Sequence, residues 1–137
     1  MKEILFRAKR LDNGEWVYGY IRHYQNNQHT TEKWTIYEPA LSLEYEVDPA
    51  TIGQYTGLTD KNGTKIFEGD ILKVFYYGKS KIFGVVKFGK TRFFIDDNFM
   101  GMGDYMKTPM NEMFSRYEFE VVGNVHDNPE LWKGGEK

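Results

Sequence analysis

Two pairs of carboxylates are the residues best placed to do acid/base chemistry. Glu68 and Asp70 flank a glycine, and Asp96 and Asp97 are adjacent. Two acids close together can separate their pKa values and move protons, or they can hold a divalent cation. At a turn, however, an aspartate more often accepts hydrogen bonds from backbone N–H groups. We therefore expect Asp70 to fix a turn; the alternative is a metal-dependent hydrolase built on Glu68 and Asp70.

The remaining residue types that bind metals or cofactors do not form a recognisable site. His23 and His29 lack the close spacing of a helical metal-binding pair, and His126 has no evident nucleophile beside it. Gly101 and Gly103 lack the third glycine of a dinucleotide fingerprint. The chain has no cysteine, which excludes disulfides and thiolate metal sites. The sequence predicts a protein that is not an enzyme and that carries neither a metal nor a cofactor.

A basic and aromatic segment offers a different chemistry. Residues 71–95 hold six basic residues and no acidic one, which gives this span +6 and leaves −8 for the rest, since the net charge is −2. Alternation along two strands places rings and amines together on one face, a combination that binds single-stranded nucleic acids. The candidate binding residues are Lys73, Phe75, Tyr77, Lys81, Phe83, Lys87 and Arg92.

Three interpretations of these seven residues stay open. They pack within the protein, they contact a protein partner or a second copy of the chain, or they bind nucleic acid. Lysines on strands also protect sheet edges from aggregation, and the sequence pI of about 5.9 is low for a nucleic-acid binder. Opposite charges on the two parts of the chain would permit a homo-oligomer.

The elements that would position this face are set by glycine turns in the middle of the chain. Asn62 and Gly63 form a pair typical of a type I′ hairpin turn, in which both central residues need positive φ. Gly69, between Glu68 and Asp70, marks a second turn. We expect these residues to fold the middle of the chain into a β ribbon.

The rest of the chain shows mostly strand patterns. Residues 3–9 and 15–22 predict a hairpin about Asp12-Asn13-Gly14, and residues 23–33 predict a long loop or an extended hairpin tip. Thr108-Pro109 and Asn128-Pro129 each predict the start of a helical turn, as a cap followed by proline. The further predicted strands cover residues 34–37, 43–47, 71–77, 81–88, 91–95 and 117–125.

Length and composition indicate a folded protein. A chain of 137 residues with 40% hydrophobic residues fits one domain, or two small lobes that share a core. The N-terminus lacks a signal sequence, and no apolar run approaches the ~18 residues of a membrane span. We expect a soluble cytoplasmic protein with no membrane partner.

Three segments resemble the YopX family of phage and prophage proteins. They are Ile4–Ala8 with the following Trp16-Val17-Tyr18, the central Gln54–Ile71, and Val122–Leu131. Lys9 stands where family members often carry tryptophan. The resemblance implies a small β-rich fold with an SH3-like barrel portion, in a protein carried by mobile elements.

Together these observations predict a mostly β protein with an N-terminal β-hairpin lobe, an SH3-like barrel or pseudobarrel, and two short helical turns. The lobe would cover residues 1–58 and the barrel residues 59–137, packed as one compact unit. The predicted function is a non-enzymatic phage or prophage module that acts through protein–protein contacts. The alternative is a nucleic-acid-binding protein that uses the basic and aromatic segment.

Overall fold

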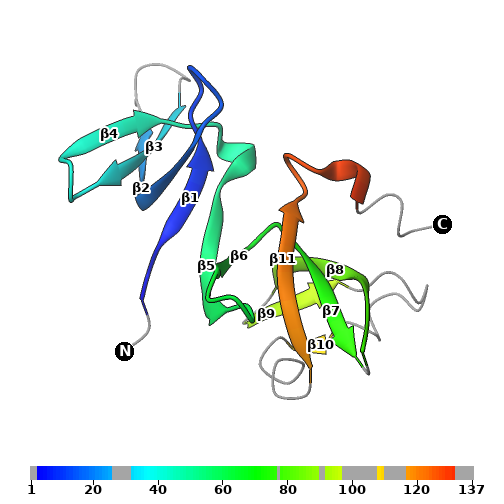
Figure 1. Cartoon of the computed structure of the whole chain (residues 1–137). Helices are drawn as coiled ribbons and strands as arrows, with labels where there is room; N and C mark the ends of the chain where they lie inside the picture. Colours follow the sequence, from blue (N-terminus) through cyan, green and yellow to red (C-terminus); the bar gives the residue numbers. More distant parts are fainter. Residues whose placement is uncertain are drawn as a thin grey trace. The chain divides into compact units, whose positions relative to one another are not determined.

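The computed structural model describes residues 3–25, 32–76, 78–89, 92–96, 108–109 and 117–131. The chain divides into two compact units, residues 1–55 and 56–137, and both are built from antiparallel strands (Figure 1). The mostly β prediction is therefore confirmed. The sequence boundary had been placed after residue 58, and the packing of the two portions as one compact unit stays a prediction. No helix among the described residues is long and apolar enough to cross a membrane.

One sheet has the strand order β4-β3-β2-β1-β5-β6; β1 to β4 belong to the first unit, and β5 crosses the boundary between the units. The predicted N-terminal hairpin is confirmed: Phe6 to Lys9 pair with Gly19 to Trp16, and the turn between them contains Gly14 at φ +74°. The second and third strands pair up to Gln25 and Glu32, so the described part of residues 23–33 forms the extended hairpin that was one of the two predictions. The bounds are β1 (Phe6–Lys9), β2 (Trp16–Gln25), β3 (Glu32–Glu38), β4 (Leu43–Glu46) and β5 (Gly53–Thr59), with a 3₁₀ turn η1 (Pro49–Thr51) before β5.

The ends of β1 and β4 meet, which curls the sheet. Arg10 and Val47 form an antiparallel bridge, and the N–H of Leu11 donates to the carbonyl of Glu46 at 3.0 Å. A curled sheet encloses one of its faces, and the buried Ala8, Ile36 and Val47 form a core there. The opposite face of β2 and β3 is left outside this core.

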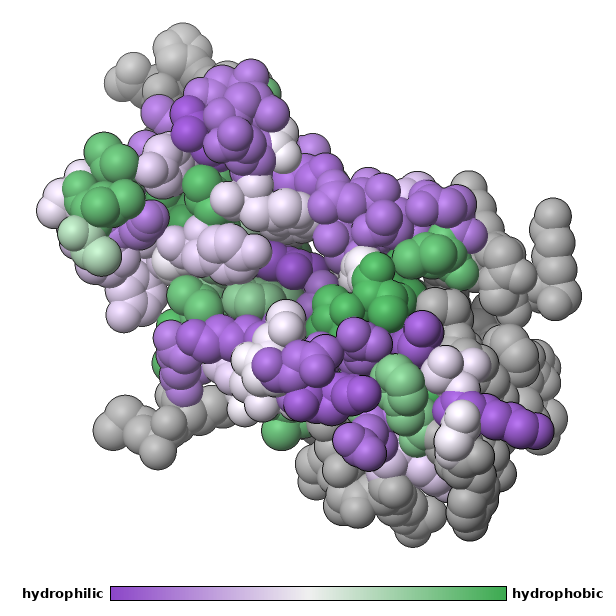
Figure 2. Space-filling view, viewed as in Figure 1, coloured by the Kyte–Doolittle hydropathy of each residue, from purple (hydrophilic) through white to green (hydrophobic). Residues whose placement is uncertain are grey.

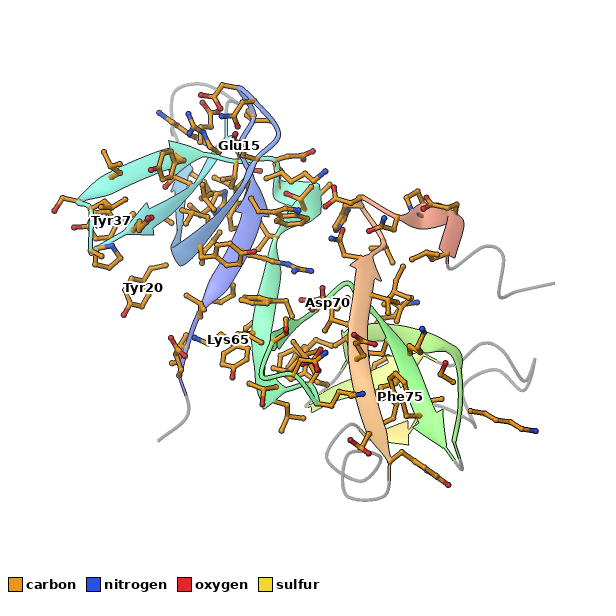
Figure 3. All side chains as sticks on the ribbon, viewed as in Figure 1. Glu15, Tyr20, Tyr37, Lys65, Asp70 and Phe75 are labelled. Atoms are coloured by element: carbon orange, nitrogen blue, oxygen red, sulfur yellow. The ribbon has the colours of Figure 1, made fainter. Side chains whose placement is uncertain are left out.

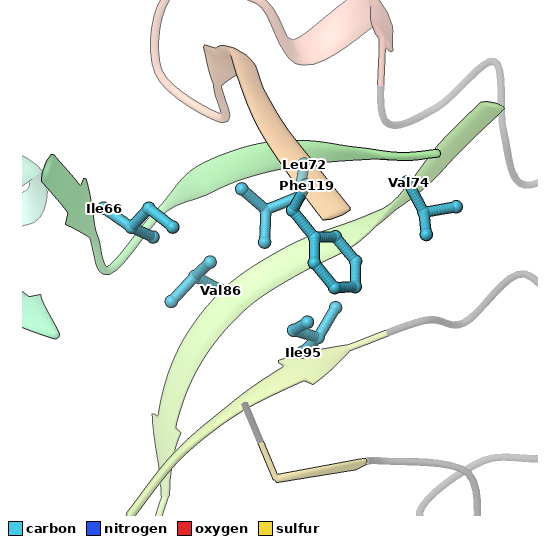
Figure 4. Close-up of a cluster of buried hydrophobic side chains, with 6 residues drawn as sticks. All are labelled: Ile66, Leu72, Val74, Val86, Ile95 and Phe119. Atoms are coloured by element: carbon cyan, nitrogen blue, oxygen red, sulfur yellow. The ribbon is translucent and has the colours of Figure 1, made fainter. Parts of the chain in front are cut away.

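The second unit contains the sheet β10-β9-β8-β7-β11. Its core gathers one buried side chain or more from β6, β7, β8, β9 and β11, as Figure 4 shows. The core residues are Ile66, Leu72, Val74, Val86, Ile95 and Phe119. The bounds are β6 (Lys65–Phe67), β7 (Asp70–Tyr76), β8 (Lys79–Gly89), β9 (Arg92–Asp96), β10 (Thr108–Pro109) and β11 (Glu118–Asn124). Among the described strands no pairing joins β10 to β11, so this sheet is not a closed barrel.

The central hairpin forms as predicted, but its turn is of another type. The N–H of Gly63 donates to the carbonyl of Asp60 at 3.0 Å, and the N–H of Asp60 donates to the carbonyl of Thr64 at 2.9 Å. Gly63 has φ +85°, whereas Asn62 is not among the residues with positive φ. The type I′ prediction is therefore wrong, and the loop is a three-residue turn that ends in a left-handed glycine.

The two predicted helical turns have different outcomes. Thr108 and Pro109 pair with Ile95 and Phe94 as β10, so a helix does not begin there. Proline is tolerated in such a strand because an edge strand can leave one N–H position unused. The residues that would have continued this helix, 110–116, lie outside the described part of the chain. The turn after Asn128 is confirmed: residues 129–131 are helical, and the N–H of Leu131 donates to the carbonyl of Asn128 at 3.1 Å.

Candidate interaction face

The polar residues of the central stretch bind the protein's own backbone. The Asp60 carboxylate is buried, and its Oδ1 accepts from the N–H groups of Asn62 and Thr64 at 2.8 and 2.9 Å. Its Oδ2 accepts from the N–H of Val121 in β11 at 2.9 Å. Thr56 Oγ1 likewise donates to the carbonyl of Ile66 at 2.8 Å. Asp60 and Thr56 thus fix the hairpin, and Asp60 also attaches it to β11. The side-chain oxygens of both residues are used in hydrogen bonds within the protein.

Asp70 also has the structural role that the sequence predicted. It is 1% exposed, and its Oδ2 accepts from the N–H of Phe67 at 2.8 Å across the second turn. Gly69, at φ +96°, donates its N–H to the carbonyl of Val86 at 2.8 Å. Asp70 therefore closes the turn that leads into β7. No group of three or more possible metal-ligating side chains occurs within the described residues.

The C-terminal turn is held in the same way by two asparagines. Asn124 Oδ1 accepts from the N–H groups of His126 and Asp127 at 3.0 and 2.9 Å. Asn128 Oδ1 accepts from the N–H of Asn124 at 3.2 Å. The side chain of Asn128 also fills the space beside Gly123, where an added Cβ would lie 2.5 Å from Asn128 Oδ1. This segment too is a structural turn.

The seven predicted binding residues are described in part. Phe75 is half-buried outside the core cluster, and the Lys61 and Lys73 ammonium groups lie 4.1 and 5.8 Å from its ring centroid. Lys87 is exposed. Tyr77 and the side chains of Lys81, Phe83 and Arg92 lie outside the description, so the complete set stays a prediction.

Pairing with β11 changes the charge around Lys73 and Phe75. Glu120 pairs with Lys73, and Glu118 pairs with Phe75. Directly paired residues lie on the same face of a sheet. The register between β7 and β8 also shifts at Leu72/Lys73, which interrupts the simple alternation that the sequence argument assumed. The basic span of residues 71–95 is therefore joined by acidic residues from a distant part of the chain.

The first unit presents a different aromatic surface, which we call the tyrosine face. It consists of Tyr18, Tyr20, Arg22 and Tyr24 of β2 with Tyr37 of β3. Residues two apart on a strand share a face, and Tyr20 pairs directly with Tyr37. Tyr18, Tyr20 and Tyr24 are 45%, 52% and 44% exposed.

The exposure of these rings follows from the curl of the sheet. Val17 and Ile21, the alternate residues of β2, pack against the enclosed core. The tyrosines therefore point outward, and Tyr20 projects away from the ribbon in Figure 3. On the side shown in Figure 2, hydrophobic residues form separate patches among hydrophilic ones. Tyrosine is close to neutral in hydropathy, so an aromatic surface of this kind does not stand out as a hydrophobic patch.

A hydrogen-bond network centred on Glu44 orders one side of the tyrosine face. Glu44 Oε2 accepts from the hydroxyls of Thr35 and Tyr24 at 2.6 and 2.7 Å, and its Oε1 lies 3.4 Å from a guanidinium nitrogen of Arg22. The Arg22 guanidinium lies over the Tyr37 ring, 4.4 Å from its centroid. The Thr35 and Tyr24 hydrogen bonds lower the pKa of Glu44. Glu44 is thus an ionised anchor that fixes the orientation of its neighbours.

The sequence interpretation missed the tyrosine face, although its signal is visible. Tyr18, Tyr20 and Arg22 alternate with Val17, Gly19 and Ile21 in a run already assigned to a strand, and Tyr24 continues the pattern beyond its predicted end. Tyr37 and Glu44 could not be added to this face from the sequence alone. They reach it because β3 pairs with β2 and β4 pairs with β3. His23, considered above as a metal ligand, is instead stacked on Trp34 with ring centroids 3.9 Å apart.

Comparisons with known proteins agree with this fold. A solved structure, "Crystal structure of protein EF1440 from Enterococcus faecalis", is similar with a TM-score of 0.55 and 25% sequence identity, over 96% of this chain and 99% of that one. No curated protein matches the chain. The family model described as YopX protein matches residues 5–133, which is most of the chain and includes the tyrosine face. The chain therefore belongs to the YopX protein family.

Proposed function

We propose that this protein is a non-enzymatic binding module that acts through protein–protein contacts, and that the tyrosine face is its contact surface. The observation that carries the proposal is the alignment of three exposed tyrosines and an arginine on one face of β2. Tyrosine and arginine are enriched among the residues that dominate protein interfaces. These side chains do not belong to the core of this unit, which lies on the opposite side of the sheet.

The hydrogen bonds that order part of the face also support a binding role. A tyrosine ring has two side-chain torsions, so it loses little conformational entropy when it is buried by a partner. The Tyr24 hydroxyl and the Arg22 guanidinium are already held by Glu44. Binding to an ordered surface avoids part of the cost of immobilising side chains.

The nucleic-acid alternative rests on the segment of residues 71–95, and its support is weaker. Glu118 and Glu120 pair with Phe75 and Lys73, and they place negative charge where a phosphate backbone would lie. A fluorescence titration with single-stranded DNA and RNA tests this alternative. The nucleic-acid alternative requires that the protein bind at low salt and that the affinity fall steeply as the salt concentration rises. The affinity should also fall when Lys73 and Lys87 are replaced by alanine.

Site-specific photo-crosslinking tests the proposed contact surface. A photoreactive phenylalanine analogue replaces Tyr20 in one protein and the exposed turn residue Glu15 in a control protein. We expect protein adducts at position 20 that are absent at position 15; an adduct with a second copy of the chain counts as such a contact. Adducts at both positions alike, or at neither, would overturn the proposal, and a nucleic-acid adduct would favour the alternative.

The family resemblance supports two finer proposals. The first is that the second unit is related to SH3-like small barrels. A β-meander that begins at a Gly-Asp turn, as in this unit, is compatible with such barrels. The second is that the protein is encoded by a phage or prophage.

A further inference from the structure

Arg22 has the geometry of a ready receptor for a carboxylate. Its guanidinium lies over the Tyr37 ring, with 4.4 Å between Cζ and the ring centroid. It interacts with the Tyr24 side chain and makes a long contact, 3.4 Å, with Glu44, and its side chain is 47% exposed. A guanidinium carries five N–H donors in a planar fork that matches the two oxygens of a carboxylate. Among the residues that the structure describes, the fork of Arg22 is therefore oriented but not filled by a two-point ion pair.

Arg10 in the same chain makes a two-point ion pair with a carboxylate. Its guanidinium lies over the Tyr45 ring, 4.6 Å from the centroid, much as Arg22 lies over Tyr37. Its Nε and a terminal nitrogen, however, contact the two carboxylate oxygens of Asp12 at 2.9 and 2.6 Å. Within the described part of the chain, Arg10 has a bidentate carboxylate partner and Arg22 does not.

The surroundings of Arg22 define the rest of the ligand. Tyr20 and Tyr24 lie two residues before and after it on the same face of β2, and both are exposed. A carboxylate at Arg22 would thus have an aromatic ring on either side. We propose, building on the proposed protein-binding function, that the tyrosine face binds a protein segment in which a carboxylate is flanked by apolar side chains, with Arg22 receiving the carboxylate.

Charge around the site favours a single carboxylate over a polyanion. Glu44 pairs with Tyr37 and Glu46 pairs with Thr35, so two carboxylates occupy the β4 side of the face, and both residues are exposed. A nucleic-acid backbone carries a charge at every nucleotide and would bring further phosphates toward these groups. A protein segment with one acidic residue places one charge at Arg22 and apolar atoms elsewhere.

Selection from a displayed library of random peptides tests the inference. The wild-type protein, Arg22→Gln and Arg10→Gln are each used as bait, with circular dichroism to establish that each variant is folded. We expect wild-type and Arg10→Gln proteins to enrich peptides with Asp or Glu beside apolar residues, and Arg22→Gln to lose that enrichment. A selected peptide should bind Arg22→Gln about tenfold more weakly or worse, since a charged hydrogen-bonded contact contributes ~1.5–3 kcal/mol. Arg22→Lys, which keeps the charge but loses the fork, should also bind more weakly.

The outcomes separate this inference from the proposed function. Enriched peptides without acidic residues that depend on Tyr20 would overturn the carboxylate inference and leave the protein-binding proposal standing. Acidic enrichment that survives Arg22→Gln would overturn the role of Arg22. Failure to enrich any peptide, or binding of single-stranded DNA or RNA that depends on Arg22, would also contradict the inference.

Discussion

At the scale of single residues, polar side chains in the central turns and the C-terminal turn accept hydrogen bonds from backbone N–H groups. Asp60 is the strongest case, because one buried carboxylate receives N–H groups from Asn62, Thr64 and Val121. Loop backbone that leaves the ladder of a sheet needs such acceptors, since an unpaired buried N–H costs roughly 1–3 kcal/mol. These residues explain how the hairpin is built, and the proposed contact surface consists of other residues.

Asp60→Ala is expected to destabilise the protein strongly. Removing the carboxylate leaves three backbone N–H groups without their acceptor, so we expect a loss of about 3 kcal/mol or more in the free energy of unfolding, measured by urea denaturation. Asp12→Ala is the matched control, because Asp12 is exposed and its ion pair with the Arg10 side chain lies at the surface. Similar losses in the two variants would contradict the role assigned to Asp60.

Glu44 leads to a prediction about pH. Its pKa is lowered in the folded protein, first by the Thr35 hydroxyl and then by the Tyr24 hydroxyl, so the unfolded chain binds its proton more tightly than the folded one. The stabilisation by ionised Glu44 is therefore present above its unfolded pKa of ~4.3 and is lost as pH falls through the lower folded pKa. The difference in stability between wild type and Glu44→Gln should accordingly disappear in acid.

Carbon-13 NMR of the Glu44 carboxyl measures this directly. The titration midpoint should lie below the usual range for glutamate, and Thr35→Val should raise it by removing the larger cause of the shift. A midpoint that does not move in Thr35→Val would show that the hydroxyl does not stabilise the carboxylate.

At the scale of elements, the approach of β2 to β3 depends on a residue without a side chain. Gly19 is buried, and a Cβ added there would collide with the backbone carbonyl oxygen of Tyr37. A carbonyl in a paired strand cannot move without disturbing the ladder, so Gly19→Ala should cost about 2–3 kcal/mol. Thermal unfolding of Gly19→Ala and Gly14→Ala makes the comparison.

Gly14→Ala is the informative control because the space around Gly14 is open. An added Cβ there meets no atom within 4 Å, and the cost comes from the positive φ of +74° alone, about 1 kcal/mol. If Gly19→Ala were no more destabilising than Gly14→Ala, the close contact between β2 and Tyr37 would not be a determinant of stability.

The elements also show where sequence patterns are sufficient. Local sequence patterns predicted the N-terminal hairpin, the turn at Gly69 and the turn-fixing role of Asp70, because each depends on a few neighbouring residues. The turn at Asn62-Gly63 was assigned the wrong type because Asp60, outside the two-residue signature, supplies the acceptors that select a longer loop. Thr108-Pro109 carries a helix-start signal that is overridden by pairing with β9.

The candidate site was harder to predict for the same reason. The basic character of residues 71–95 is a property of the sequence, but the acids beside Lys73 and Phe75 arrive from β11, over forty residues away in the chain. The tyrosine face likewise joins β2 to Tyr37 and Glu44 through long-range pairing. Local alternation indicates which residues share a strand face, and only the order of strands decides which charges surround them.

At the scale of the whole molecule, the two units carry separate cores. Ile36 belongs to the core of residues 1–55 and Ile95 to that of residues 56–137; both are 0% exposed, and the two clusters share no residue. Replacing either isoleucine by alanine should cost about 2–5 kcal/mol, because it removes buried methyl groups and leaves a cavity. Proteins unfold locally in cooperative units. Each substitution should therefore reduce the stability of the unit that contains the cavity before that of the other unit.

Hydrogen exchange followed by mass spectrometry tests this distribution, and each variant is the control for the other. In Ile36→Ala, amides of β1 to β4 should exchange faster while those of β7, β8 and β11 keep more of their protection; Ile95→Ala should give the reverse. The substitution is chemically identical in the two proteins, so the difference reports only the position of the cavity. Equal acceleration along the whole chain in both variants would mean that the two cores form one cooperative unit. In that case peptide binding at the tyrosine face should weaken with Ile95→Ala as much as with Ile36→Ala, whereas separate units require the face to tolerate damage to the second core.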